Sequence, residues 1–188
     1  MFRVDYPQDW GKLRKLDFDR LAKFKREHYC CNLEWLPGTL GSEGGGHLVT
    51  FDTPHFRKAP VLVDMDLLRE YVPHARKYGI TVIAYLNLHW YSYEFAEEHP
   101  GWEQVLQDGR PYGRVRPLYG NGTTMCPNGP WRDWAFRLIE EAMRTGIQGV
   151  FLDGPAVFPG CCYCEHCRAL FRERTGDCLL YTSPSPRD

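Results

Sequence analysis

The stretch QGVFLDGPAVFPGCCYCEHCRALFRERTG, residues 148–176, decides the fold. Its apolar run 149–152 is too short for a helix and starts at a glycine, which is typical of a strand buried on both faces. Asp153 follows at the carboxyl end of that strand, and Gly154 and Pro155 then turn the chain. In parallel α/β folds this end of a strand carries binding and catalytic groups, so Asp153 is a candidate for catalysis.

The order of strand, loop and helix recurs along the rest of the chain. The apolar spacing predicts helices over 18–28, 64–79 and 131–145, and strands over 28–36 and 80–88. Long loops follow the strands, whereas the connections from helix back to strand are short, as in a barrel whose loops build the active face. An open doubly wound sheet is the alternative, but no glycine-rich phosphate fingerprint follows the first strands.

The chain is too short for a whole barrel of this kind. A complete barrel needs about 250 residues, and this chain has 188. We therefore predict an α/β fold, a truncated (β/α)8 TIM barrel, roughly its first half, with residues 1–177 as a partial catalytic domain. Residues 178–188 read as a disordered, non-native tail that resembles sequencing-adapter read-through at the end of a metagenomic reading frame.

Local signals set the expected ends of the helices. Asp17 and Asp64 are expected as N-caps, because a carboxylate can accept from the free N–H groups of a first turn. Pro73 should kink or shorten the second helix, since it has no N–H to donate. Gly176 should end the last helix.

Composition excludes several functional classes. The hydrophobic fraction of 43% and the charged fraction of 25% are ordinary for a soluble globular domain. A net charge of -1 without a basic run gives no indication of nucleic acid or of an anionic membrane as a partner. No apolar run could span a bilayer, and no signal pattern opens the chain, so we expect a cytoplasmic protein. The oligomeric state is not predicted.

Cysteine spacing indicates a metal site. Cys162, Cys164 and Cys167 place three soft ligands within reach of one ion, and Cys126, in a separate loop, could complete a tetrahedron. We predict structural zinc, because four thiolates leave no open position for catalysis. Unbonded thiols or a disulfide are the alternative, but bridges between such close neighbours are strained. Cys161, adjacent to Cys162, is expected to be spare, and Cys30 and Cys31, in a predicted strand, are expected to be small buried side chains.

These residues carry a resemblance to known families. The run from Cys126-Pro-Asn through the strand ending in Asp153 to the cysteine motif resembles the zinc-bearing segment of family 42 β-galactosidases. Residues 18–176 as a whole resemble more closely the glycoside hydrolases of the "hypothetical glycosyl hydrolase 6" type, which are similar to α-fucosidase-like and β-galactosidase-like barrels. The resemblance implies a glycosidase that acts on carbohydrate, with zinc ligands carried over to four residues: Cys126, Cys162, Cys164 and Cys167.

One departure from the family pattern bears on the chemistry. The β-galactosidases end this strand in Asp-Asn-Glu, and the glutamate is their acid/base. Here the sequence reads Asp153-Gly154-Pro155, and proline cannot transfer a proton, so galactosidase activity does not carry over. In α-fucosidase-like barrels an aspartate at the end of this strand is the nucleophile, which implies that role for Asp153. A loop-bracing aspartate before glycine is the plainer alternative.

Glycoside hydrolysis needs a second carboxyl group across the scissile bond. Glu34 is a candidate, although a glutamate at a strand exit also binds hydroxyls or forms salt bridges, and we expect the partner on a strand that the truncation removed. His89, Trp90 and Tyr91 should line the sugar subsite, with a packed aromatic loop as the alternative. The predicted substrate-binding residues are Glu34, His47, Asn87, His89, Trp90 and Tyr91.

Two other functions remain open at this point. One is a non-catalytic carbohydrate-binding barrel in which Asp153 holds a ligand, and the other is a zinc-stabilised barrel that hydrolyses a substrate other than a glycoside. We also expect this 188-residue fragment itself to be inactive, because half a barrel exposes strand edges and apolar helix faces.

Overall fold

The structure is a computed structural model that describes residues 2–3, 16–40 and 47–179. The glycine run 44–46 and most of the predicted tail, residues 180–188, lie outside the described residues. Within the described part, no helix is long and apolar enough to cross a membrane.

The chain divides into two compact units. The sheet unit comprises Met1–Leu88 and Phe136–Asp153. The cysteine unit comprises His89–Ala135 and Gly154–Asp188. The chain therefore leaves the sheet unit directly after Leu88 and again after Asp153, and it returns between Ala135 and Phe136.

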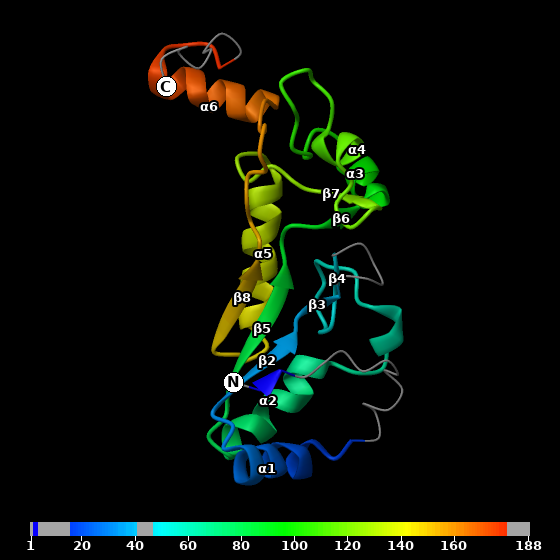
Figure 1. Cartoon of the computed structure of the whole chain (residues 1–188). Helices are drawn as coiled ribbons and strands as arrows, with labels where there is room; N and C mark the ends of the chain where they lie inside the picture. The colour runs from blue at the N-terminus through cyan, green and yellow to red at the C-terminus, as the bar shows by residue number, and fades with distance from the viewer. Residues whose placement is uncertain (1, 4–15, 41–46, 180–188) are drawn as a thin grey trace. The chain divides into compact units, whose positions relative to one another are not determined.

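The sheet unit is built on four parallel strands. They are β1 (Phe2–Arg3), β2 (Leu33–Pro37), β5 (Thr81–Asn87) and β8 (Gly149–Asp153), in the order β1-β2-β5-β8. All neighbouring pairs are parallel, and Figure 1 shows β2, β5 and β8 side by side. The predicted parallel α/β arrangement is confirmed. The described strands form an open sheet, so the truncated barrel stays a prediction.

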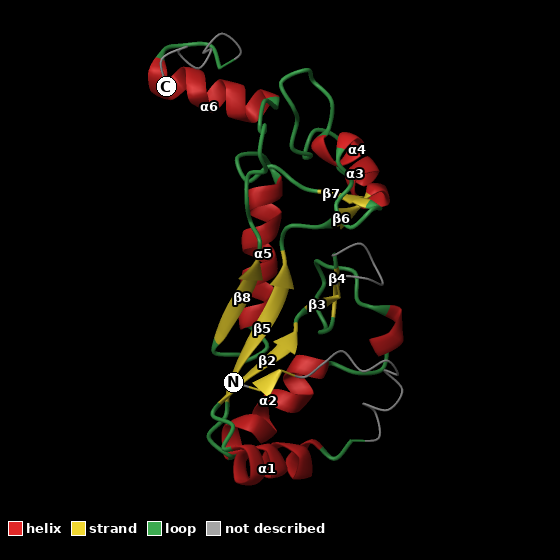
Figure 2. Cartoon of the chain, viewed as in Figure 1, coloured by secondary structure: helices red, strands yellow, loops and turns green. Residues whose placement is uncertain are grey.

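Three longer helices alternate with these strands (Figure 2). They are α1 (Phe18–Tyr29), α2 (Leu67–Lys77) and α5 (Trp131–Met143). Each forms where the sequence has helical apolar spacing, and α1 begins after Asp17, whose side chain accepts a hydrogen bond from the N–H of Arg20 as predicted.

The start of α2 corrects one prediction. Its N-cap is Asp66, whose Oδ1 accepts from the backbone N–H of Arg69 at 2.9 Å, and not Asp64. The helix therefore begins later than expected. It also continues through Pro73 to Lys77, so the missing N–H of the proline does not end it.

The core of the sheet unit lies on the helix-covered face of the sheet. Val82, Ala84 and Leu86 alternate along β5 and are fully buried, as the period of two requires. The prediction that 149–152 is buried on both faces is wrong, because Phe151 is 46% exposed and Leu152 is 38% exposed. The reason is position: β8 is the edge strand of the described sheet and pairs with β5 alone.

Short elements occupy the loops that follow the strands. In the sheet unit, β3 (Thr39–Leu40) pairs antiparallel with β4 (Leu48–Val49), and a 3-10 helix, η2, covers Pro60–Leu62.

The described residues of the cysteine unit include an antiparallel strand pair and three helices that lie wholly within the unit. The pair is β6 (Tyr91–Ser92) with β7 (Gly122–Thr123). The helices are α3 (Tyr93–Glu98), α4 (Tyr112–Val115) and α6 (Glu165–Thr175). The C-cap of α6 is Gly176, as the sequence predicts, and its φ is +78°.

Candidate functional site

Asp153 is fixed at the carboxyl edge of the parallel sheet. It lies opposite Asn87, so β5 and β8 end together. Its backbone carbonyl accepts from the N–H of Leu88 at 3.0 Å. Its Oδ2 accepts from the hydroxyl of Tyr85 at 2.5 Å. The carboxylate is thus held in the part of a parallel fold where catalytic groups lie.

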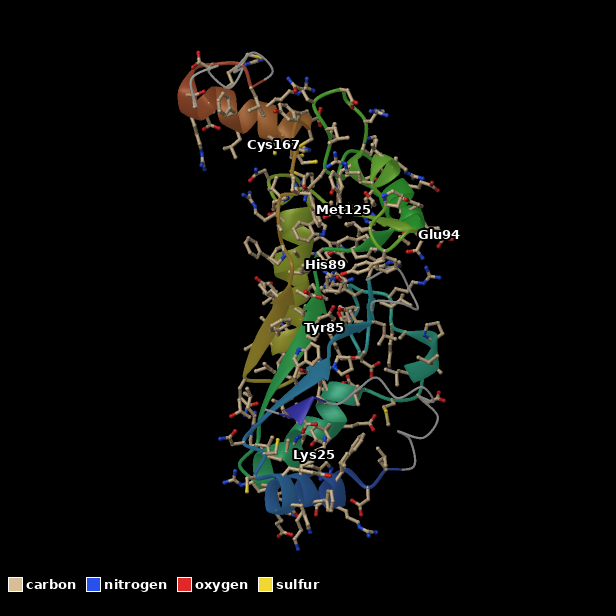
Figure 3. The ribbon with its side chains drawn as sticks, viewed as in Figure 1. Lys25, Tyr85, His89, Glu94, Met125 and Cys167 are labelled. Carbon is tan, nitrogen blue, oxygen red and sulfur yellow. The ribbon has the colours of Figure 1, made fainter. Side chains whose placement is uncertain are left out.

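Three aromatic side chains lie beside Asp153 on the same face of the sheet. Tyr85 is opposite Phe151 in the register, and their ring centroids are 6.1 Å apart in a stacked arrangement. Trp35 meets both rings edge-on, with centroids 4.8 Å from Tyr85 and 5.7 Å from Phe151. Figure 3 labels Tyr85 on β5. This aromatic face carries the hydroxyl that binds the candidate nucleophile.

Glu34, the predicted second carboxylate, lies on the opposite face of the sheet. In the register Glu34 pairs with Val82, and Asp153 pairs with Asn87. Val82 and Asn87 are an odd number of residues apart on β5, so their side chains and those of their partners leave opposite faces. Glu34 and Asp153 therefore cannot flank one glycosidic bond.

The surroundings of Glu34 give it a structural role. Its side chain is fully buried, and its carboxylate accepts hydrogen bonds from the Lys25 ammonium and, at 2.5 Å, from the Tyr71 hydroxyl. Lys25 is itself 3% exposed, so the two charges neutralise each other inside the core. Burial, together with the Glu34 charge, raises the pKa of Tyr71 and keeps that phenol protonated.

Two further predicted ligands lie in the sheet unit. Asn87 is 1% exposed at the end of β5, and its backbone N–H donates to Thr39 Oγ1 at 2.8 Å. His47 is half-buried directly before β4. Their roles as substrate ligands stay predictions.

Trp90 and Tyr91 are part of the interior of the cysteine unit. Trp90 is 9% exposed, and its Nε1 donates to the carbonyl of Leu118 at 3.1 Å. The hydroxyl of Tyr91 accepts from Trp131 Nε1 at 3.0 Å, and the Tyr91 ring stacks on Phe95 at 4.7 Å. Burial raises the pKa of Tyr91. This geometry favours the packed aromatic loop over a sugar-stacking role for these two residues.

His89 differs from its two neighbours because it is only partly buried. Its Nε2 lies 3.0 Å from the hydroxyl of Tyr119, and the two rings meet edge-on with centroids 5.7 Å apart. His89 follows the end of β5, where Figure 3 labels it.

The four predicted zinc ligands come together in the cysteine unit. The sulfur atoms of Cys126, Cys162, Cys164 and Cys167 all lie within 4.8 Å of one another, and all four residues are buried. The Sγ of Cys126 is 3.4 Å from that of Cys167 and 3.5 Å from that of Cys164. Cys126 comes from the loop after β7, and Cys167, labelled in Figure 3, from the first turn of α6. The predicted meeting of two loops is therefore confirmed.

The arrangement of the cysteines fits zinc. A tetrahedral zinc with Zn–S bonds of about 2.3 Å places its sulfurs about 3.8 Å apart, close to the separations given above. Two of the sulfurs accept hydrogen bonds. The backbone N–H of Val105 donates to Cys162 Sγ at 3.4 Å, and Asn128 Nδ2 donates to Cys167 Sγ at 3.3 Å. Such hydrogen bonds orient thiolate ligands and stabilise their charge.

Neighbouring sulfurs shift the pKa values of two of the cysteines in opposite directions. Hydrogen bonds with neighbouring sulfurs raise the pKa of Cys126 and lower the pKa of Cys164. A divalent ion would allow all four to be thiolates at once.

Sequence reasoning missed two residues of these sites. Tyr85 precedes Asn87 by two positions, so the two side chains share a face of the sheet. Asn87 is opposite Asp153 in the register, and Tyr85 therefore lies on the face of Asp153. Asn128 belongs to the Cys126-Pro-Asn motif, and its position two residues after a ligand was the available signal.

The parallel sheet, with its site at the carboxyl edge, defines a mixed α/β domain like those of glycoside hydrolases. A family model described as "Hypothetical glycosyl hydrolase 6" matches residues 41–154, and the chain belongs to this family. No curated protein matches the chain.

Solved structures share the fold. α-L-Fucosidase isoenzyme 2 from Paenibacillus thiaminolyticus matches with a TM-score of 0.67 and 21% identity, over 93% of this chain and 26% of the fucosidase. A hypothetical protein from Ruminiclostridium thermocellum matches with a TM-score of 0.57 and 11% identity, over 81% of this chain and 75% of that one. A noncanonic maltogenic α-amylase from Thermotoga neapolitana matches with a TM-score of 0.50 and 14% identity, over 84% of this chain and 39% of the amylase. The chain thus spans about a quarter of the fucosidase.

Proposed function

We propose that this chain is part of a glycoside hydrolase that cleaves O-glycosidic bonds with Asp153 as its nucleophile. The observation that carries the proposal is the carboxylate of Asp153 at the end of β8, bound by the hydroxyl of Tyr85. Residues 41–154, which match the glycosyl hydrolase family, include both groups. The substrate is a carbohydrate.

In this mechanism Asp153 attacks the anomeric carbon and forms a glycosyl ester while the leaving oxygen takes a proton from a second carboxyl group. Water, deprotonated by that same group, then hydrolyses the ester. Glu34 is on the wrong face for this role, so the acid/base residue would come from a further strand of the barrel. The hydrogen bond from Tyr85 would orient the carboxylate of Asp153 and stabilise its negative charge before attack.

The cysteine site would have a structural part in this enzyme. When bound, zinc would hold the loop that carries Cys126 to the segment 162–167, and four thiolates leave no position for water or substrate. The ion would thereby fix the loop that leaves Asp153, because residues 154–161 run directly from that carboxylate to the cysteines.

The test is covalent trapping in the protein that contains this chain within a complete barrel. A 2-deoxy-2-fluoro-α-L-fucosyl fluoride or the corresponding α-D-glucosyl fluoride should leave a sugar ester on the peptide that contains Asp153, detected by mass spectrometry. Asp153→Asn should remove the adduct. An adduct on another carboxylate would refute the assignment, and sugar binding without an adduct would favour the non-catalytic carbohydrate-binding barrel.

A further inference from the structure

Tyr119 is an exposed aromatic residue in an unusual backbone conformation. Its side chain is 78% exposed, and its φ is +52°, in the left-handed region that residues other than glycine seldom adopt. The turn around it is closed by hydrogen bonds between Leu118 and Gly122, from N–H to carbonyl in both directions, at 2.9 and 3.1 Å. The ring is thus presented to solvent by a defined turn.

The turn is anchored on the buried Trp90. The carbonyl of Leu118 accepts from Trp90 Nε1 at 3.1 Å. A Cβ on Gly122 would lie 2.0 Å from that same nitrogen, so only glycine allows the turn to pack this closely on the indole. The core of the cysteine unit therefore fixes the position of the Tyr119 ring.

His89 holds the other end of the Tyr119 side chain. The 3.0 Å contact between its Nε2 and the phenol hydroxyl sets the direction of the ring. His89 is itself confined by Gly154, where an added Cβ would lie 2.8 Å from the His89 Cβ. Gly154 is bonded to Asp153, so this contact lies one residue along the chain from the proposed nucleophile.

We propose that Tyr119 is a sugar-binding residue whose ring packs on the C–H face of a pyranose, and that His89 is its positioning residue. The choice of a sugar as ligand rests on the proposed function. With 78% of the side chain exposed, most of the ring surface is uncovered, and the left-handed backbone at a residue other than glycine costs free energy. Contact with the apolar face of a sugar would offset part of this free-energy cost, because the tyrosine ring buries apolar surface while its hydroxyl keeps a polar partner. All the groups that build the turn belong to the cysteine unit, so the 188-residue chain carries the whole subsite.

The test is saturation-transfer difference NMR on the 188-residue chain, with methyl α-L-fucopyranoside and maltose as separate probes. Tyr119→Asn removes the ring while asparagine still tolerates the left-handed backbone. We expect it to weaken the Kd of the bound sugar by about threefold to tenfold, the size of one aromatic contact. Tyr119→Phe keeps the ring but loses the His89 contact and should have a smaller effect. Phe136→Ala, which removes a 56%-exposed ring on α5, is the matched control and should leave binding unchanged.

Each outcome decides the proposal. Weaker binding in Tyr119→Asn with unchanged binding in Phe136→Ala supports it. Equal binding by wild type and Tyr119→Asn overturns the subsite and leaves the proposed function intact. If neither probe binds the wild-type chain, the subsite is also overturned, whereas the proposed function is decided separately by the trapping of Asp153.

Discussion

Glu34 and Asp153 leave opposite faces of the same parallel sheet. The register places Glu34 beside Val82 and Asp153 beside Asn87 on β5, an odd number of positions apart. One carboxylate therefore faces the aromatic side chains and the other faces Lys25 in the core. Asp153, the predicted nucleophile, and Glu34, the weaker candidate for the second carboxylate, therefore have different surroundings.

Replacing Glu34 should affect stability rather than catalysis. Glu34→Gln leaves the Lys25 charge buried without its counter-ion, and we expect the free energy of unfolding to fall by about 3–5 kcal/mol. Urea denaturation of the 188-residue chain measures this. The paired variant Glu34→Leu with Lys25→Met removes both charges and should recover most of the loss. An unchanged denaturation midpoint in Glu34→Gln would contradict the buried pair.

Removing the hydroxyl that binds the proposed nucleophile should lower catalytic efficiency. A hydrogen bond to a charged group contributes about 1.5–3 kcal/mol, so Tyr85→Phe in the complete enzyme should reduce kcat/KM about tenfold or more. Tyr93→Phe is the matched control, because its hydroxyl donates to the carbonyl of Gly113 at 2.9 Å, within the cysteine unit. Steady-state kinetics on an aryl glycoside would compare them. Equal losses in both variants would argue against a role for Tyr85.

The four-cysteine site should bind zinc with a stoichiometry of about one ion per chain. Elemental analysis of protein purified with zinc measures this directly. Cys164→Ser should lose most of the metal, whereas Cys161→Ser, next to the cluster but outside it, should retain it. Metal should also be released as pH falls, because protons compete for the thiolates. Equal zinc content in the two variants would show that the cluster is not the binding site.

The sequence predicted the features that depend on local pattern. The helix beginning after Asp17 followed from its cap and apolar spacing, and the meeting of Cys126 with the later cysteines followed from ligand chemistry and spacing. The signal for the helix lies within a few residues. The signal for the cysteine cluster lies in the strict geometry that one ion requires of its ligands.

Features that depend on tertiary partners could not be predicted in this way. The face that Glu34 occupies is set by its register against β5, which the sequence of β2 alone does not contain. Phe151 reads as core, but its exposure depends on whether another strand pairs with β8. Trp90 and Tyr91 follow a strand and were predicted to line a sugar subsite, but Tyr91 belongs to β6, which pairs with β7, and both side chains are buried.

The contact between α1 and α2 should give the sheet unit a defined dependence on pH. Lys77 Nζ and the Tyr78 hydroxyl bind the carboxylate of Asp19 at 2.7 and 2.8 Å and lower its pKa to about 2. Because the folded-state pKa lies below the ordinary value of 3.8, this contribution is complete above that value and is lost as pH falls from there toward about 2. Asp19→Asn should therefore lower the Tm at pH 6 and make little difference at pH 2, with a smaller effect in high salt. Asp133→Asn, which alters an 83%-exposed carboxylate on α5, is the control. A difference between wild type and Asp19→Asn that stays the same at both pH values would show that this carboxylate does not link the two helices.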